Sequence, residues 1–78
     1  MFSQDFLKNF PERLRSLRMT TGISQVDLGK DIGASKQSIA NLENGHRTPG
    51  LDLFISIADY FVVSLDYLAG RSDKKEIR

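Results

Sequence analysis

Amide and small polar side chains cluster between residues 36 and 44 of this 78-residue chain. If that segment is helical, Ile39 and Leu42 share one face, and Gln37 and Asn41 project from the opposite face. A solvated helix surface usually alternates Glu and Lys, whereas this one carries amides, one lysine and small residues. Amides can form paired hydrogen bonds with adenine, and lysine can reach the acceptors of guanine. The pattern therefore predicts a helix that contacts base edges in a DNA major groove.

Gln37 and Asn41 are the leading candidates for base contacts, with Lys36 and Ser38 beside them. Taken alone, each would be read as an ordinary solvated side chain, and only the outward position on a helix favours base contact. Polar groups at helix starts and in the following loop suit phosphates, because helix N-terminal amides attract anions. The predicted phosphate contacts are Gln25, Ser35, Asn44, His46 and Arg47.

Composition narrows the classes of function. The chain has no cysteine and one histidine, so we expect no disulfide, no metal and no cofactor. It has no paired carboxylates, no nucleophile with a base and no phosphate-cradling glycine loop, so we expect no catalytic residues and no enzyme activity. Charged and polar residues interrupt the apolar stretches and no signal-peptide pattern is present, which predicts a cytoplasmic protein. With a net charge of only +1, any DNA affinity must depend on where the charges lie and on two copies acting together.

Helical spacing and capping residues predict an all-α fold without strands. Serines that are good N-caps precede three of the segments, and glycines end several of them. The expected helices span about 10–21, 25–32, 35–44, 51–61 and 64–69. The apolar stripes expected to form the core are Phe10, Leu14 and Leu17; Leu28 and Ile32; Ile39 and Leu42; Leu51, Phe54, Ile57, Ala58 and Phe61; and Leu65 and Leu68.

A three-residue turn, 33–35, joins the second and third helices, which is the plan of a helix-turn-helix unit. Gly33 supplies the positive φ that so short a turn needs. Gly29 costs about 1 kcal/mol of helix propensity relative to alanine. We expect its missing side chain to let the two helices approach closely.

These segments resemble the Cro/C1-type (XRE-like) helix-turn-helix family, and within it the lambdoid phage repressors. The resemblance covers about residues 10–70 and rests on Leu17-Arg18, Gly22-Ile23-Ser24-Gln25, Gln37-Ser38-Ile39, Leu42-Glu43-Asn44-Gly45, Pro49, Leu51, Ala58 and the run from Val63 to Gly70. It implies a five-helix lambda-repressor-like domain that binds double-stranded DNA and regulates transcription, most simply as a repressor. It also implies a homodimer with two reading helices about 34 Å apart on a near-palindromic operator, and a structural ion pair between Arg18 and Glu43.

The chain departs from the family pattern at three positions. Gly29 and Ala34 stand where alanine and valine are common. Val62 stands where glycine normally ends the fourth helix, which puts that turn in doubt because a β-branched residue disfavours positive φ.

We expect an N-terminal extension over 1–9, the DNA-binding domain over 10–70, and a charged, frayed tail or linker over 71–78. Phe2, Phe6 and Phe10 share a helical spacing, so they either cover the core or form a surface for a protein partner. Leu53, Ile55 and Tyr60 lie off the inward stripe of their helix, which indicates self-association or extra packing. The alternative functions are an antitoxin-like protein that binds a toxin and regulates its own operon, or a restriction-modification control protein.

Overall fold

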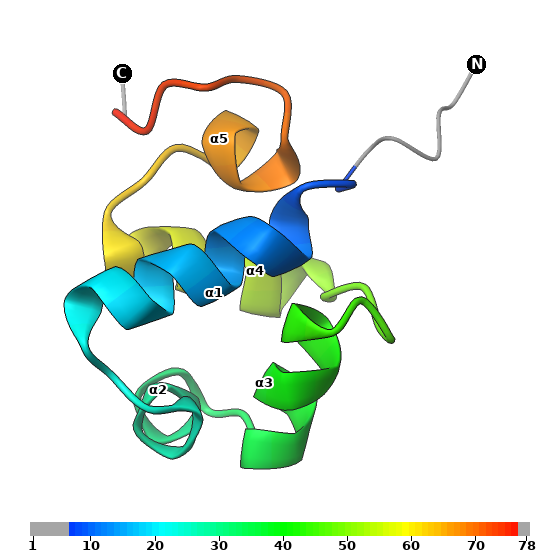
Figure 1. The fold of residues 1–78 in the computed structure, drawn as a ribbon, viewed down its shortest axis with the longest axis vertical. Coiled ribbons are helices and arrows are strands. Elements are labelled where there is room, and N and C mark those ends of the chain that lie inside the picture. Colours follow the sequence, from blue (N-terminus) through cyan, green and yellow to red (C-terminus); the bar gives the residue numbers. More distant parts are fainter. Residues whose placement is uncertain (1–6, 77–78) are drawn as a thin grey trace.

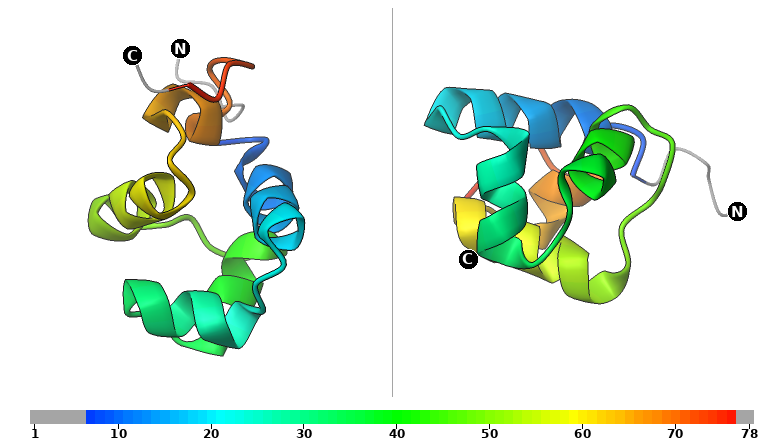
Figure 2. Two further views of the ribbon diagram at one scale, coloured as in Figure 1. Left: turned by 90° about the vertical axis from the view of Figure 1, so that its left-hand side faces the viewer. Right: turned by 90° about the horizontal axis from the view of Figure 1, so that it is seen from below.

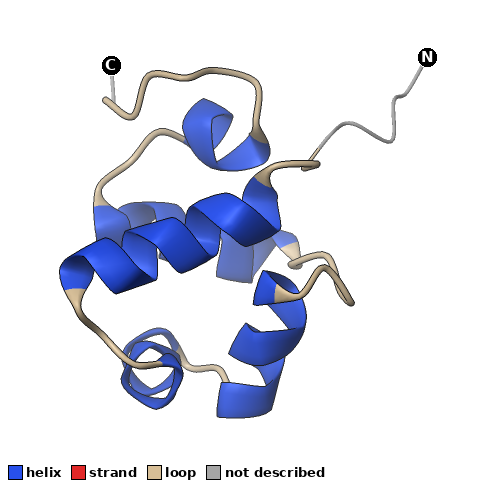
Figure 3. Ribbon diagram, in the orientation of Figure 1, coloured by secondary structure: helices blue, strands red, loops and turns tan. Residues whose placement is uncertain are grey.

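The computed structural model describes residues 7–76, and within that range the chain is helical with no strand (Figure 3). The five helices described are α1 (Phe10–Thr21), α2 (Gln25–Ile32), α3 (Lys36–Glu43), α4 (Leu51–Phe61) and α5 (Leu65–Ala69). The all-α prediction is confirmed. The third and fifth helices were expected to begin at their capping serines, Ser35 and Ser64. In the structure each begins one residue later.

Serine caps fix where three of the helices begin. Ser24, Ser35 and Ser64 each lie in extended backbone, and each hydroxyl accepts the amide N–H three residues later at 2.9–3.0 Å. Each cap satisfies one of the amides that have no partner within the helix. Helices α2 and α3 are only eight residues long, so these caps and tertiary packing must supply most of their stability.

Helix α4 ends at Val62 in the left-handed conformation, with φ 56° and ψ 50°. The helix therefore ends where the family's glycine would end it, although valine disfavours this region. The Val62 side chain is 70% exposed, so its packing contributes little to offset the free-energy cost of this backbone conformation. The turn therefore forms in spite of the valine, and Val62 is held in a backbone conformation that it disfavours.

The core draws on all five helices among residues 7–76. Most of the predicted stripe is buried, and the buried apolar side chains are Phe10, Leu14, Leu17, Leu28, Ile39, Leu42, Ile57, Ala58, Val63, Leu68 and Ala69. Two expectations are wrong, since Leu51 is 72% exposed and Leu65 is 46% exposed. Each is the first residue of its helix and so lies at the rim of the packed layer. Val63, in the α4–α5 connection, is buried in the core instead.

Helices α1 and α4 form the middle of the molecule, with α2 and α3 at one end and α5 at the other (Figures 1 and 2). Helix α3 packs on both α1 and α2, and α4 packs on α2 and α5. Between α2 and α4, Tyr60 donates its hydroxyl hydrogen to Asp31 at 2.8 Å. Helices α1 and α4 therefore support one side of the helix-turn-helix unit, and no helix within residues 7–76 covers its other side.

Residues 71–76, part of the tail expected to fray over 71–78, contact α1 and α5, whereas 77–78 lie outside the described residues. The Arg13 guanidinium on α1 donates to the carbonyl oxygens of Tyr67 and Ser72 at 2.5 and 2.7 Å, pairs with Asp73 at 3.0 Å and stacks on the Tyr67 ring. The Ser64 amide donates to the Lys75 carbonyl at 2.8 Å. The segment is thus held at both ends of α5.

Within 7–76, no helix has the length and apolar character needed to cross a lipid bilayer. Phe2 and Phe6 lie outside the described residues. Leu7, which follows them, packs against the core and donates its amide hydrogen to the Ala69 carbonyl at 3.1 Å.

Candidate nucleic-acid interface

The α2–α3 turn is tight because Gly29 has no side chain. A Cβ at Gly29 would lie 2.3 Å from the carbonyl oxygen of Ala34, a separation that real Cβ atoms essentially never show. The amide of Ala34 also donates to the Gly29 carbonyl at 2.8 Å. Gly33, with φ 79°, reverses the chain between them. The close approach predicted from Gly29 is present in the structure.

Helix α3 has one buried and one open face. Ile39 and Leu42 are 0% and 2% exposed, whereas Lys36 and Gln37 are exposed. Asn41 is half-buried, one turn after Gln37, and its Oδ1 accepts a hydrogen bond from Gln37 Nε2 at 3.1 Å. The two leading candidates for base contact therefore lie side by side on the open face and contact each other.

Ser35 and Ser38 form a small network at the start of α3. The Ser35 hydroxyl accepts the Ser38 amide and donates to the Ser38 hydroxyl, both at 3.0 Å. The network leaves the Ser38 hydroxyl with a hydrogen of its own to donate. Both residues thus stay on the open end of the helix, with their hydroxyl orientations set by the cap.

Glu43 anchors the end of α3 to α1. Its side chain is 1% exposed, and Arg18 contacts both carboxylate oxygens, through Nε at 2.5 Å and Nη2 at 3.0 Å. Arg18 also donates to the Ile23 carbonyl at 3.1 Å. This is the structural ion pair that the family resemblance implies.

The charge of Glu43 is maintained in spite of its burial. Burial alone would raise the pKa of Glu43, but hydrogen bonds from Arg18 and Gln25 and the charges of Arg18 and Arg15 outweigh it, so the pKa lies below its ordinary value. The hydrogen bond to Glu43 raises the pKa of Arg18. Both groups are therefore ionised at neutral pH.

Gln25 and Asn44 make contacts within the protein that the sequence did not indicate. Gln25 is half-buried and donates from Nε2 to Glu43 Oε1 at 3.1 Å. Asn44 ends α3, and its Oδ1 accepts from Arg15 Nη2 at 3.3 Å. Arg15 and Arg18 lie one helical turn apart on α1. This spacing was the sequence signal that could have indicated that Arg15, like Arg18, faces the end of α3. Gln25 and Asn44, which were predicted to contact phosphates, therefore also make contacts within the protein.

His46 and Arg47 lie exposed in the loop between α3 and α4. The His46 amide donates to the Asn41 carbonyl at 2.9 Å, which holds the loop against the end of α3. Arg47 lines a small cavity of about 70 Å³ together with Ser38 and Leu42. The loop thus brings positive charge beside the open face of α3.

The described residues 7–76 contain no cluster of three or more histidine and carboxylate side chains that could hold a metal ion. The open face of α3 offers amide, hydroxyl and ammonium donors together with amide acceptors. This is the chemistry of hydrogen bonding to base edges and phosphates.

A family model described as helix-turn-helix matches residues 14–68. The chain is 34% identical over 62 residues to a Bacillus subtilis protein described as the uncharacterized HTH-type transcriptional regulator YobD, covering 80% of this chain and 55% of that protein. It is 33% identical over 60 residues to the cryptic phage CTXphi transcriptional repressor RstR of Vibrio cholerae, covering 77% and 54%. The chain spans about half the length of these two relatives.

The fold is similar to that of the P22 c2 repressor, whose crystal structure was determined in complex with a synthetic operator. The TM-score is 0.77 at 28% sequence identity, and the match covers 81% of this chain and 96% of that one. The family model extends from α1 to α5 and includes the whole of the α2–α3 unit. The chain therefore belongs to the Cro/C1-type (XRE-like) helix-turn-helix family.

Proposed function

We propose that this chain is a sequence-specific double-stranded DNA-binding repressor that lays α3 in the major groove of its operator and acts by excluding polymerase. The observation that carries the proposal is the open face of α3, with Gln37 and Asn41 opposite the buried Ile39 and Leu42. Two relatives support it, because RstR is described as a transcriptional repressor and the P22 c2 repressor was crystallised on an operator. Such a protein acts where the chromosome is, in the cytoplasm.

In this proposal Gln37 and Asn41 contact base edges, with Lys36 and Ser38 beside them. The phosphate contacts come from Gln25, Ser35, Asn44, His46 and Arg47. Gln25 suits this role because its amide nitrogen has a second hydrogen in addition to the one donated to Glu43. The contact with Glu43 would hold that hydrogen in place and lower the entropic cost of binding.

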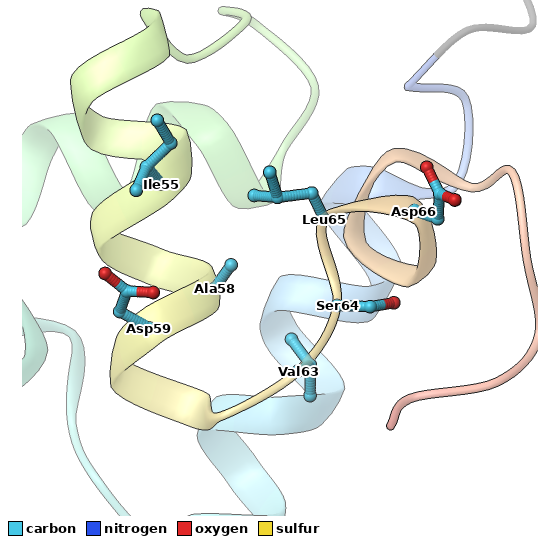
Figure 4. Close-up of a pocket in the computed structure, with 7 residues that line it drawn as sticks. All are labelled: Ile55, Ala58, Asp59, Val63, Ser64, Leu65 and Asp66. Atoms are coloured by element: carbon cyan, nitrogen blue, oxygen red, sulfur yellow. The ribbon is translucent and has the colours of Figure 1, made fainter. Parts of the chain in front are cut away.

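We further propose that the protein binds its operator as a homodimer through α4 and α5. An open groove of about 470 Å³ lies between these helices, with Ile55, Val63 and Leu65 among its lining residues (Figure 4). Ile55 and Leu65 are 39% and 46% exposed, and the adjacent Val62 is 70% exposed. A two-fold axis near this surface would pair the same apolar patch on both copies, as a closed dimer requires.

Selection of bound sites from random duplex DNA tests both parts of the proposal. We expect an inverted repeat with half-sites about one helical turn apart. Recovery of single, unrepeated sites would contradict the dimer, and recovery of no common sequence would contradict sequence-specific binding. Sedimentation of the protein on a selected duplex then gives the number of chains bound.

Substitutions on the selected operator separate base contacts from phosphate contacts. Asn41→Ala should cost about 1–3 kcal/mol at particular base pairs only. Arg47→Ala should weaken all sequences alike and reduce the salt slope of log affinity by about one. Ser16→Glu, which lowers the net charge by the same one unit at an exposed site on α1, is the control for altered charge. A uniform loss in Asn41→Ala would refute the assignment of Asn41 to base contact.

A further inference from the structure

The hydrogen bond between Gln37 and Asn41 constrains what each amide can offer to a base. Gln37 Nε2 donates one of its two hydrogens to Asn41 Oδ1 at 3.1 Å. Gln37 keeps Oε1 and its second N–H. That acceptor and donor together match the edge of adenine, which presents the N6 amino group and N7.

Asn41 is left mainly as a donor. Its Oδ1 is turned toward Gln37, whereas both hydrogens of Nδ2 remain available. In the major groove, guanine presents N7 and O6 as acceptors, thymine presents O4, and adenine presents N7 beside the hydrogens of its amino group, whereas cytosine presents only its amino group. A donor held in this way favours guanine or thymine and rejects cytosine.

We propose that Gln37 and Asn41 act as one reading unit in which Gln37 selects adenine and orients Asn41 to select guanine or thymine at a neighbouring base pair. Gln37 thereby determines specificity at two positions, although it contacts only one. This inference rests on the proposed function, since it requires α3 to lie in the major groove. The pairing also restricts two flexible amides before DNA arrives, which reduces the entropy lost on binding.

Gln37→Glu reverses the polarity of the pair. A carboxylate has no hydrogen to donate and instead accepts from Asn41 Nδ2, which turns Asn41 Oδ1 outward as an acceptor. The base preference at the position read by Asn41 should then shift from guanine or thymine to adenine or cytosine. Gln37 is exposed in the first turn of α3, where a carboxylate favours the helix, so the variant should fold.

The experiment compares base preferences from random duplex selection for the full chain and three variants. Asn41→Ala locates the base pair that Asn41 reads. At that pair, the unsubstituted protein should prefer guanine or thymine over cytosine by about 5- to 150-fold, the range for a good base contact. Gln37→Glu should invert this preference. Ser16→Glu adds the same charge at an exposed site on α1 and should leave the preference unchanged.

Three outcomes would overturn the inference. If Gln37→Glu leaves the preference at the Asn41 position unaltered, the two amides read independently. If the preference is lost without inversion, the assigned polarity of the pair is wrong. In both cases the proposed function stands. If the unsubstituted protein selects no sequence at all, the proposed function fails, and the reading unit fails with it.

Discussion

Removal of the buried carboxylate at Glu43 should loosen the helix that we propose reads DNA. In Glu43→Leu, Arg18 loses a two-point ion pair formed at 2.5 and 3.0 Å, and Gln25 loses its acceptor. The new side chain is apolar and of similar size, so the main change is an uncompensated guanidinium between α1 and α3. The perturbation therefore isolates the ion pair from the volume of the site.

The expected cost lies at the lower end of the range for breaking a buried ion pair. Removing one partner costs about 3–5 kcal/mol when the other charge stays buried. The Arg18 side chain is 16% exposed and can gain water by a small movement, so we expect about 3 kcal/mol. For a domain of this size, that lowers the melting temperature by about 12–24 °C. The total stability of a 78-residue chain is about 4–12 kcal/mol, so the loss is a large share of it.

The double variant Arg18→Met/Glu43→Leu provides the matched control. Replacing both charges by apolar groups removes the uncompensated guanidinium, so it should recover most of the stability lost in Glu43→Leu. Urea unfolding monitored by circular dichroism gives four free energies of unfolding, those of the unsubstituted protein, Glu43→Leu, Arg18→Met and the double variant. If Glu43→Leu costs less than about 1 kcal/mol, or if the double variant loses the sum of both single variants, the assigned role of the pair is refuted.

Three further predictions concern the backbone and pH. Gly29→Ala should destabilise the protein by about 1–2 kcal/mol despite its better helix propensity, because the Ala34 carbonyl must move; Ser16→Ala, at an exposed position on α1, is the control for helix propensity in thermal melts. Val62→Gly should stabilise by about 1 kcal/mol, because it relieves a left-handed valine whose side chain is exposed; an unchanged denaturation midpoint would argue against strain there. Because the pKa of Glu43 is lowered in the fold, its contribution to stability should be full above its ordinary pKa of 4.5 and lost as the pH falls through the lowered value. Urea unfolding across pH should show that decline in the unsubstituted protein, and a weaker decline in Glu43→Gln.

The sequence predicted the helices well because the local signals are strong. A capping serine, an apolar stripe and a terminal glycine all agree at α2, so its bounds were predicted to the residue. The core was less predictable at helix starts. Leu51 satisfies the helical period yet lies exposed, because periodicity gives the face of a residue and not its depth along the helix axis.

Contacts between distant residues were the least predictable part of the site. The family resemblance implied the pair of Arg18 with Glu43, whereas the contacts of Arg15 and Gln25 with Glu43 depend on how α1, α2 and α3 cross. Arg13 shows the same limit, since nothing local indicates that it holds the segment 71–76 against α5. Charge patterns identify the ions available for pairing, whereas only packing decides which of them meet.

Under the proposed function, burial of Glu43 also explains how a chain with a net charge of +1 can present a face suited to DNA. A carboxylate at the end of a reading helix would repel phosphates if it faced solvent. Here the carboxylate is 1% exposed and shared by Arg18, Gln25 and the more distant Arg15. The open face of α3 keeps Lys36 without an opposing acid on the same helix face, because Glu43 is the one acidic residue of α3. The ion pair that ties the end of α3 to α1 thus also removes a negative charge from the face that we propose contacts DNA.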